Sequence, residues 1–212
     1  MEDIVPALAD KDADPPATPD LAALIGSRIC HDLTNPLGAI GNGLELLELS
    51  GQTGSPEMAL IAESVARAKA RVQFLRVAFG TASAAHRMGG AELSGLVADH
   101  AQGGRVRIDW PPGSDVPRQE AKLAFLLLMC LETALPFGGQ ITVTRDGGRW
   151  HLTAEAERMR DLPGFWEALA GDGPLPEVAS PKVQFALAPC AAVQLGRRIA
   201  VDQAPGRLTI TG

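Results

Sequence analysis

The sequence predicts an α+β protein in which an N-terminal helical hairpin precedes a domain of mixed helices and strands. Apolar residues recur at alternating spacings of three and four in two successive stretches, which is typical of paired helices. A short stretch with glycine and proline separates these two seams. Beyond residue 90, helical and extended patterns alternate, as in a two-layer domain. We therefore expect a dimeric four-helix bundle followed by an α/β sandwich.

The first helix is expected to begin near Asp20. Residues 1–19 hold four prolines and many acidic side chains, and we expect them to be a mobile leader. Asp20 is a favourable N-cap residue, and apolar periodicity begins directly after it, at Leu21. The seam of this helix consists of Cys30, Leu33, Leu37, Ile40, Leu44 and Leu47.

A second helix follows the break SGQTGSPE at residues 50–57, where Ser55 and Pro56 resemble a helix start. Its seam consists of Met58, Ile61, Val65, Ala68, Val72, Leu75 and Phe79. Two helices joined by a short turn form an antiparallel hairpin, which we assign to residues 20–86. Because one hairpin leaves one side of its seam uncovered, we expect two copies to pack together as a homodimer.

The second domain is assigned to residues 91–212, after a small and polar boundary. Its expected elements are a helix at 91–101, a strand at 105–110, a helix at 118–135, a hairpin at 138–157, a helix at 180–196 and a hairpin at 197–210. Asp146, Gly147 and Gly148 supply the turn of the first hairpin. Pro189 is expected to kink the last helix or to move its start toward the C-terminus.

Composition excludes several functional classes. The chain has 25 acidic against 19 basic residues and a formal charge of −6, which argues against a nucleic-acid surface. No run approaches the roughly 18 apolar residues that span a bilayer, and no secretory signal is evident. We therefore expect a cytoplasmic protein that binds neither nucleic acid nor membrane.

Neither the three cysteines nor the histidines outside the first helix suggest a metal site. Neither set has paired ligand spacing. All three cysteines are expected to be ordinary buried residues: Cys30, Cys130 and Cys190. The scattered histidines are expected to be surface or capping residues: His86, His100 and His151. The tryptophans are expected in the core or at strand edges: Trp110, Trp150 and Trp166.

The first helix carries a polar stripe beside its apolar seam. If Cys30 and Leu33 face the bundle, His31 lies about 100° away, on the solvent flank. The other residues of this flank are Arg28, Asn35, Gly38 and Asn42, and Gly41 lies nearby, within the same two turns. Several glycines within two turns each cost about 1 kcal/mol of helix propensity, which favours a close backbone approach such as an inserted partner helix. A surface histidine in a dimerising helix, with glycines that merely bend it, is the alternative.

The phrase HDLTNPLGAI at residues 31–40 resembles the H-box of sensor histidine kinases. With the extension GAIGNGLELL at residues 38–47, the sequence is similar to the ChpT-type histidine phosphotransferases of alphaproteobacterial phosphorelays. In that family a dimeric helical bundle precedes a degenerate kinase ATPase domain. The resemblance covers most of the chain from about residue 20 onward.

The resemblance implies that His31 is the phospho-acceptor, since neutral imidazole is a good nucleophile near neutral pH. Asp32 would hydrogen-bond the imidazole or act as a base. Asn35 matches the position that orients a hydrolytic water in kinases. Arg28 would pair with phosphate or with an acidic receiver surface. A solvated acid, a polar surface residue and a plain salt bridge remain the alternatives for these three residues.

The second domain resembles a kinase ATP domain that has lost its nucleotide motifs. Residues 126–143, LLLMCLETALPFGGQITV, align with the asparagine box, and Leu126 and Cys130 occupy the asparagine positions. The second asparagine normally binds Mg²⁺, for which cysteine is a poor substitute. The DxGxG turn is missing from residues 150–164, and the glycine-rich lid is missing as well. We therefore expect a degenerate histidine-kinase-ATPase-like (Bergerat-type) sandwich that does not bind ATP.

The sequence thus predicts a histidine phosphotransferase of a multistep phosphorelay. It would shuttle a phosphoryl group through His31 between receiver-domain aspartates, without ATP. Its partners would be response-regulator receiver domains and a hybrid-kinase receiver domain, which would dock beside Gly38, Gly41 and Asn42. It would need no cofactor of its own, because Mg²⁺ comes with the receiver. An ATP-dependent sensor-kinase core and a non-catalytic dimerisation adaptor are the alternatives.

Overall fold

The computed structural model describes residues 25, 28–29, 32–33, 36, 38–40, 42–43, 46, 56–80, 82 and 85–212. The described residues before 47 are all helical, and we call them the N-terminal segment. The expected leader at residues 1–19 lies outside the described residues, as do four of the six positions in the first apolar seam.

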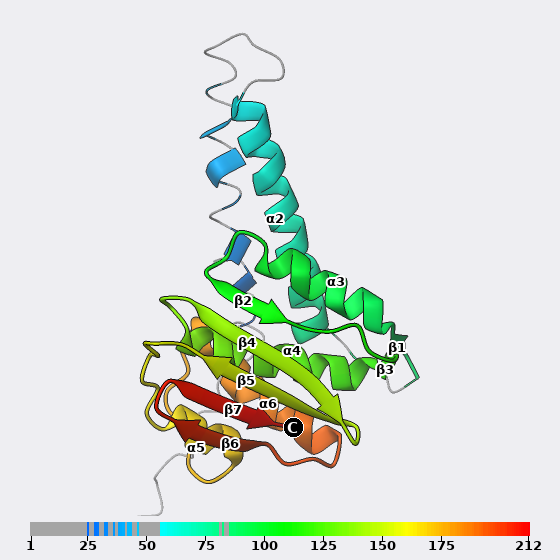
Figure 1. Ribbon diagram of the computed structural model, residues 1–212, viewed down its shortest axis with the longest axis vertical. Helices are drawn as coiled ribbons and strands as arrows, with labels where there is room; N and C mark the ends of the chain where they lie inside the picture. Colours follow the sequence, from blue (N-terminus) through cyan, green and yellow to red (C-terminus); the bar gives the residue numbers. More distant parts are fainter. Residues whose placement is uncertain are drawn as a thin grey trace, which may run out of the picture.

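Helix α2, Pro56–Phe79, begins at the proline that marked its start in the sequence. Glu57 lies in its first turn and Arg76 in its last, so both side chains complement the helix dipole. In Figure 1, α2 projects away from the sheet alongside the N-terminal segment, and α3 lies across its lower end. The lower end is therefore the part of the helix that meets the rest of the chain.

The elements after α2 follow the sequence prediction closely. The helices are α3 (Gly90–Ala101), α4 (Arg118–Ala134), α5 (Phe165–Ala170), the 3₁₀ turn η1 (Ser180–Lys182) and α6 (Gln184–Gln194). The strands are β1 (Arg87–Met88), β2 (Val106–Asp109), β3 (Val116–Pro117), β4 (Gly139–Asp146), β5 (Arg149–Glu155), β6 (Ala200–Ala204) and β7 (Arg207–Thr211). Helix α5 and the short strands β1 and β3 were not predicted.

The main sheet has five strands in the order β2-β4-β5-β7-β6. Strands β2 and β4 are parallel, and every other neighbouring pair is antiparallel. Strands β1 and β3 form a separate antiparallel pair. Both expected hairpins are present. Gly147 and Gly148 lie at the turn of the first hairpin with φ of 54° and 80°, the left-handed region that a tight hairpin turn requires.

One face of the sheet is apolar and packs against helices. The buried strand residues on this face are Ile141, Val143, Trp150, Leu152, Ala154, Leu208 and Ile210. Helices α4 and α6 pack together and lie behind the sheet in Figure 1. These two layers confirm the mixed α+β class of the prediction.

Helix α4 is the centre of the core. Most of its side chains are buried, and it contacts α2 as well as α6. Phe125 of α4 stacks on Phe74 of α2 with ring centroids 4.7 Å apart, and Trp110 meets Phe125 at 5.5 Å. All three tryptophans are buried, as predicted. The lower end of α2 is therefore part of the same hydrophobic core as the sheet.

One prediction about the cysteines is wrong. Cys130 is fully buried on α4, but Cys190 is exposed on α6. Helix α6 turns Ala188, Ala191 and Ala192 toward the core, which leaves Cys190 on its outer side. An apolar neighbourhood in the sequence did not reveal which side of the helix would be covered. Among the described residues, no helix has the length and apolarity needed to cross a membrane.

Candidate functional site

Arg28 and Asp32 connect the predicted phospho-acceptor region to the rest of the protein. Arg28 Nε donates to Asp32 Oδ2 at 2.7 Å, across one turn of the N-terminal segment. Arg28 Nη1 donates to the carbonyl oxygen of Pro181 at 3.0 Å. Pro181 belongs to the 3₁₀ turn before α6, so this arginine ties the segment to the C-terminal elements. The salt bridge that was the alternative role for Arg28 is thus present.

The Asp32 carboxylate lies between two guanidinium groups. Besides Arg28, Arg71 of α2 donates to the same oxygen, from Nη2 at 2.6 Å and from Nε at 3.1 Å. The Asp32 side chain is only 11% exposed. Charge-assisted hydrogen bonds of this kind are stronger than neutral ones, and two nitrogens from one guanidinium also fix its orientation. Asp32 is therefore held in place from two helices.

Arg71 also reaches His100 of α3. Its Nη1 lies 3.2 Å from Nδ1 and 3.3 Å from Nε2 of the imidazole. Nε2 lies 2.9 Å from Oε1 of Glu132 on α4. A carboxylate only accepts, so we assign the ring proton to Nε2, which leaves Nδ1 to accept from Arg71. Asp32, Arg71, His100 and Glu132 thus form a continuous chain, which we call the junction relay.

The environment of Glu132 keeps its carboxyl ionised. Burial raises the pKa of this group, but His100, Arg71 and Arg28 together lower it by more. The pKa therefore lies below its ordinary value of 4.5. At neutral pH the relay ends in a carboxylate on the central core helix.

The imidazole of His100 is held between its polar partners and an aromatic ring. Phe74 stacks on it with a centroid separation of 3.8 Å and an interplanar angle of 18°. Phe74 is completely buried, and the His100 side chain is 5% exposed. The prediction that His100 is an ordinary surface or capping residue is therefore wrong. Glu132 offered a sequence signal, because a lone charge within an apolar helix needs a partner.

A hollow of about 310 Å³ lies beside the junction relay. Its lining includes Asp32, Pro36, Ser64, Arg67, Arg71 and His100. The hollow sits where the N-terminal segment, α2 and α3 meet, and charged side chains of all three elements border it. Among the described residues, no group of three or more histidine, cysteine or acidic side chains could hold a metal ion.

The predicted site residues are only partly described. His31, Asn35 and Gly41 lie outside the described residues. Gly38 and Asn42 are described and exposed.

Two glycines of the N-terminal segment have very different surroundings. A Cβ placed on Gly38 would meet nothing within 4 Å. One placed on Gly43 would lie 2.4 Å from Cγ1 of Ile61. Gly43 therefore serves close packing against α2 of the same chain, whereas Gly38 faces open space.

The two positions that align with the asparagine box face the core. Leu126 and Cys130 are both fully buried in α4, against which α6 packs. Burial raises the pKa of the Cys130 thiol well above its usual range. Gln184 of α6 is buried as well and donates from Nε2 to Thr133 Oγ1 at 2.8 Å. This part of α4 therefore presents packed side chains and no oxygen ligand at either position.

Comparisons with known proteins agree with this arrangement. Residues 90–207 match the family model described as the histidine phosphotransferase C-terminal domain. The chain is 34% identical over 189 residues to the protein phosphotransferase ChpT of Brucella abortus (strain 2308), covering 86% of this chain and 90% of that protein. A solved bacterial phosphotransferase at 1.7 Å resolution superposes with a TM-score of 0.77 and 30% identity, covering 93% of this chain and 98% of that one.

Proposed function

The chain belongs to the ChpT-type histidine phosphotransferases, and from this premise we propose that it passes a phosphoryl group between receiver domains through His31. The protein is a phosphotransferase of this family. The observation that carries the finer proposal is the H-box phrase HDLTNPLGAI, because His31 is the nucleophile-bearing residue in it. The homology spans nearly the whole of the related phosphotransferase, so both parts of the chain belong to the comparison.

The proposed chemistry is two successive in-line transfers. A neutral imidazole nitrogen of His31 attacks the phosphorus of an aspartyl phosphate on a first receiver domain. The N–P bond forms as the P–O bond to the aspartate breaks, and the aspartate leaves as a carboxylate. A carboxylate of a second receiver then attacks the same phosphorus and releases the imidazole. Positioning and charge neutralisation do most of the catalytic work in such transfers.

The receivers supply the metal in this proposal. Their acidic pockets would carry Mg²⁺, which prefers oxygen ligands, so this chain would need no cofactor. A receiver domain of a hybrid kinase would be the donor and a response regulator the acceptor. Docking would occur beside Gly38, Gly41 and Asn42, where the open space around Gly38 leaves room for a partner backbone.

Three further residues have proposed roles next to His31. Asp32 would hydrogen-bond the imidazole. Asn35 would orient a water for hydrolysis of the phosphohistidine. Arg28 would add positive charge for phosphate or for the receiver, although its Nε is engaged by Asp32.

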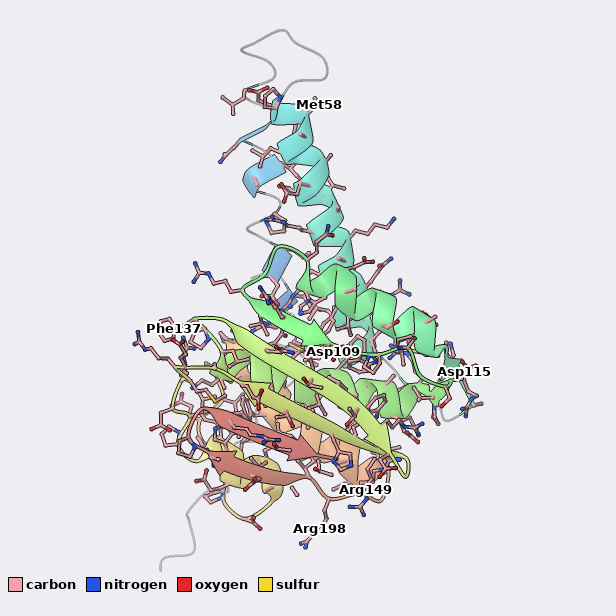
Figure 2. All side chains as sticks on the ribbon, in the orientation of Figure 1. Met58, Asp109, Asp115, Phe137, Arg149 and Arg198 are labelled. Carbon is pink, nitrogen blue, oxygen red and sulfur yellow. The ribbon has the colours of Figure 1, made fainter. Side chains whose placement is uncertain are left out.

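We also propose that a second copy of the chain covers the apolar face that the N-terminal segment and α2 form together. This face borders a hollow of about 580 Å³ lined in part by Leu33, Ile40, Val65, Ala68 and Val72. Val65 is 47% exposed and Met58 is 45% exposed. Figure 2 labels Met58 at the far end of α2. The seam spacing is that of a helical bundle, so two hairpins would close each other's face into four helices.

ATP has no role in the proposed reaction. Support comes from the buried Leu126 and Cys130, which stand where a kinase would carry nucleotide-binding asparagines. A sensor kinase remains the main alternative function, since it would share the fold. A dimerisation adaptor without chemistry is the second alternative.

One experiment separates the three functions. Purified protein is mixed either with a receiver domain phosphorylated on aspartate or with labelled ATP and Mg²⁺. We expect acid-labile, base-stable label on the wild type from the receiver only, and no label on His31→Gln. Label from ATP without a receiver would identify a kinase. Absence of label from either donor would favour the adaptor.

A further inference from the structure

We propose that Arg71 and His100 are positioning residues. Through them the C-terminal elements hold Asp32 in the geometry that phosphoryl transfer requires, and Asp32 is the residue next to the phospho-acceptor. The proposal rests on the function proposed for His31. It extends that function by making the rate of phosphoryl transfer depend on the junction relay as well as on the H-box.

Four separate elements meet in the relay. Asp32 comes from the N-terminal segment, Arg71 from α2, His100 from α3 and Glu132 from α4. Residues so far apart in the chain are ordered together only by the tertiary fold. Each link lies within hydrogen-bond reach, at 2.6 Å, 3.2 Å and 2.9 Å from Asp32 to Glu132. The segment beside His31 is therefore anchored on the central helix of the core.

The partners leave Arg71 little freedom. One edge of its guanidinium bonds Asp32 and Nη1 faces the imidazole, which is stacked on the buried Phe74. Arg67, one turn earlier on α2, is a useful contrast. Its side chain is 55% exposed and pairs with Glu63 of its own helix. Exposed pairs of that kind contribute about 0–1 kcal/mol and fix little.

The same contacts assign Asp32 a holding role rather than that of a proton acceptor. Its Oδ2 accepts three guanidinium N–H groups at 2.6–3.1 Å. Protonation of the carboxylate would weaken these charge-assisted bonds. Asp32 is thus a fixed anchor, and in this proposal it would position the imidazole of the preceding residue. Misplacing a reacting group by about 1 Å can cost about 100-fold in rate.

The test measures single-turnover transfer from a phosphorylated receiver at several receiver concentrations. The variants are Arg71→Gln, Arg71→Lys, His100→Gln and Asp32→Asn, with Arg67→Gln as the matched arginine control. We expect Arg71→Gln and His100→Gln to lower the maximal rate about 10- to 100-fold. The receiver concentration at half-maximal rate should change less than about 2-fold, since positioning residues do not bind the partner. Arg67→Gln should stay within about 2-fold of wild type.

Arg71→Lys keeps the charge but cannot contact Asp32 and His100 together, so it should lose activity nearly as Arg71→Gln does. The double variant Asp32→Asn with Arg71→Gln should be no slower than the slower single variant, because both changes break one unit. Melting temperatures and circular dichroism accompany each rate, so that rates are compared per folded molecule.

Wild-type maximal rates in folded Arg71→Gln and Arg71→Lys overturn the proposal. So does a double variant whose rate loss equals the product of the two single losses. A lowered melting temperature with an unchanged maximal rate also overturns it, because that is the signature of a merely structural role. Failure of the wild type to accept label, or labelling of His31→Gln, contradicts the function proposed for His31 instead. The two failures are therefore distinguishable.

Discussion

The two halves of α2 are built from similar residues but have different surroundings. In the lower half, Phe74, Leu75 and Val77 are between 0% and 4% exposed and belong to the main core. In the upper half, before Arg71, Met58, Leu60 and Val65 are 45%, 42% and 47% exposed. The helix therefore begins as an apolar surface and ends as a core element.

This difference shows which part of the protein buries each half of α2. The C-terminal elements of the same chain close the lower half. Among the residues that the structure describes, the N-terminal segment is what lies beside the upper half, and the remaining apolar face is the one proposed to meet a second copy. The junction relay lies between the halves, at Arg71. Five predictions follow from these features, in order of decreasing effect.

The largest effect is expected in the lower half. Phe74→Ala removes a fully buried ring that stacks on both Phe125 and His100. We expect a loss of about 3–5 kcal/mol in the free energy of unfolding, measured by urea denaturation. Met58→Ala, at an exposed position of the same helix, should lose less than about 1 kcal/mol by the same measurement at low protein concentration. Equal losses would contradict the division of the helix.

In the upper half, the expected effect is on association. Val65→Asp places a charge in the face proposed to be buried by the second copy, and burying an unpaired charge is costly. We expect dimerisation to weaken by at least about 10-fold, or about 1.4 kcal/mol, measured by sedimentation equilibrium. Ala59→Asp adds the same charge at another exposed position of α2, outside the face that lines the hollow, and should leave the dimer intact. A monomeric wild type would remove the second copy from the proposal.

The two glycines of the N-terminal segment provide a matched pair. Gly38→Ala gains up to about 1 kcal/mol of helix propensity, since nothing lies near the added methyl. Gly43→Ala gains the same propensity but must displace Ile61, at a cost of about 1–3 kcal/mol. The urea midpoint of unfolding should therefore be higher for Gly38→Ala than for Gly43→Ala.

Gly38→Ala also tests the docking proposal. If a receiver approaches the backbone there, the variant should be more stable and yet slower in phosphoryl transfer. Unchanged transfer at any receiver concentration would place the docking site elsewhere.

The smallest effect is the pH dependence of stability that arises from Glu132. Its pKa is lower in the folded protein than the ordinary 4.5, so ionisation stabilises the fold above that pH. This contribution is lost as the pH falls through the lowered folded value. The difference in unfolding free energy between wild type and Glu132→Gln should therefore be largest above about pH 5 and shrink at lower pH. A difference that is constant with pH would contradict the lowered pKa.

Much of the chain beyond residue 55 could be predicted because local chemistry dictates it. Pro56 marks the start of α2, and the unbroken apolar run of α4 can only be a buried helix at its length. Gly147 and Gly148 permit the positive φ of a tight hairpin turn. The family could likewise be recognised from a short phrase around His31.

Other features were missed because they depend on contacts between distant residues. Helix α5 is only six residues long and is bounded by Gly164 and Gly171 in the left-handed conformation, which gave no periodic pattern. The parallel pairing of β2 with β4 is a choice of neighbours that no local pattern encodes. Cys190 and His100 were misjudged because burial depends on which side of a helix another element covers.

The sequence by itself determined the longer helices, the hairpins, the acidic character of the chain and the phrase that identifies its family. These follow from spacing and residue type, which act over a few residues. Only the tertiary structure decided that Asp32, Arg71, His100 and Glu132 meet, because their partners lie 29 to 39 residues apart along the chain. It also decided that one half of α2 is covered and the other is not. Hydrogen bonds and burial at that range exist only after the chain has folded.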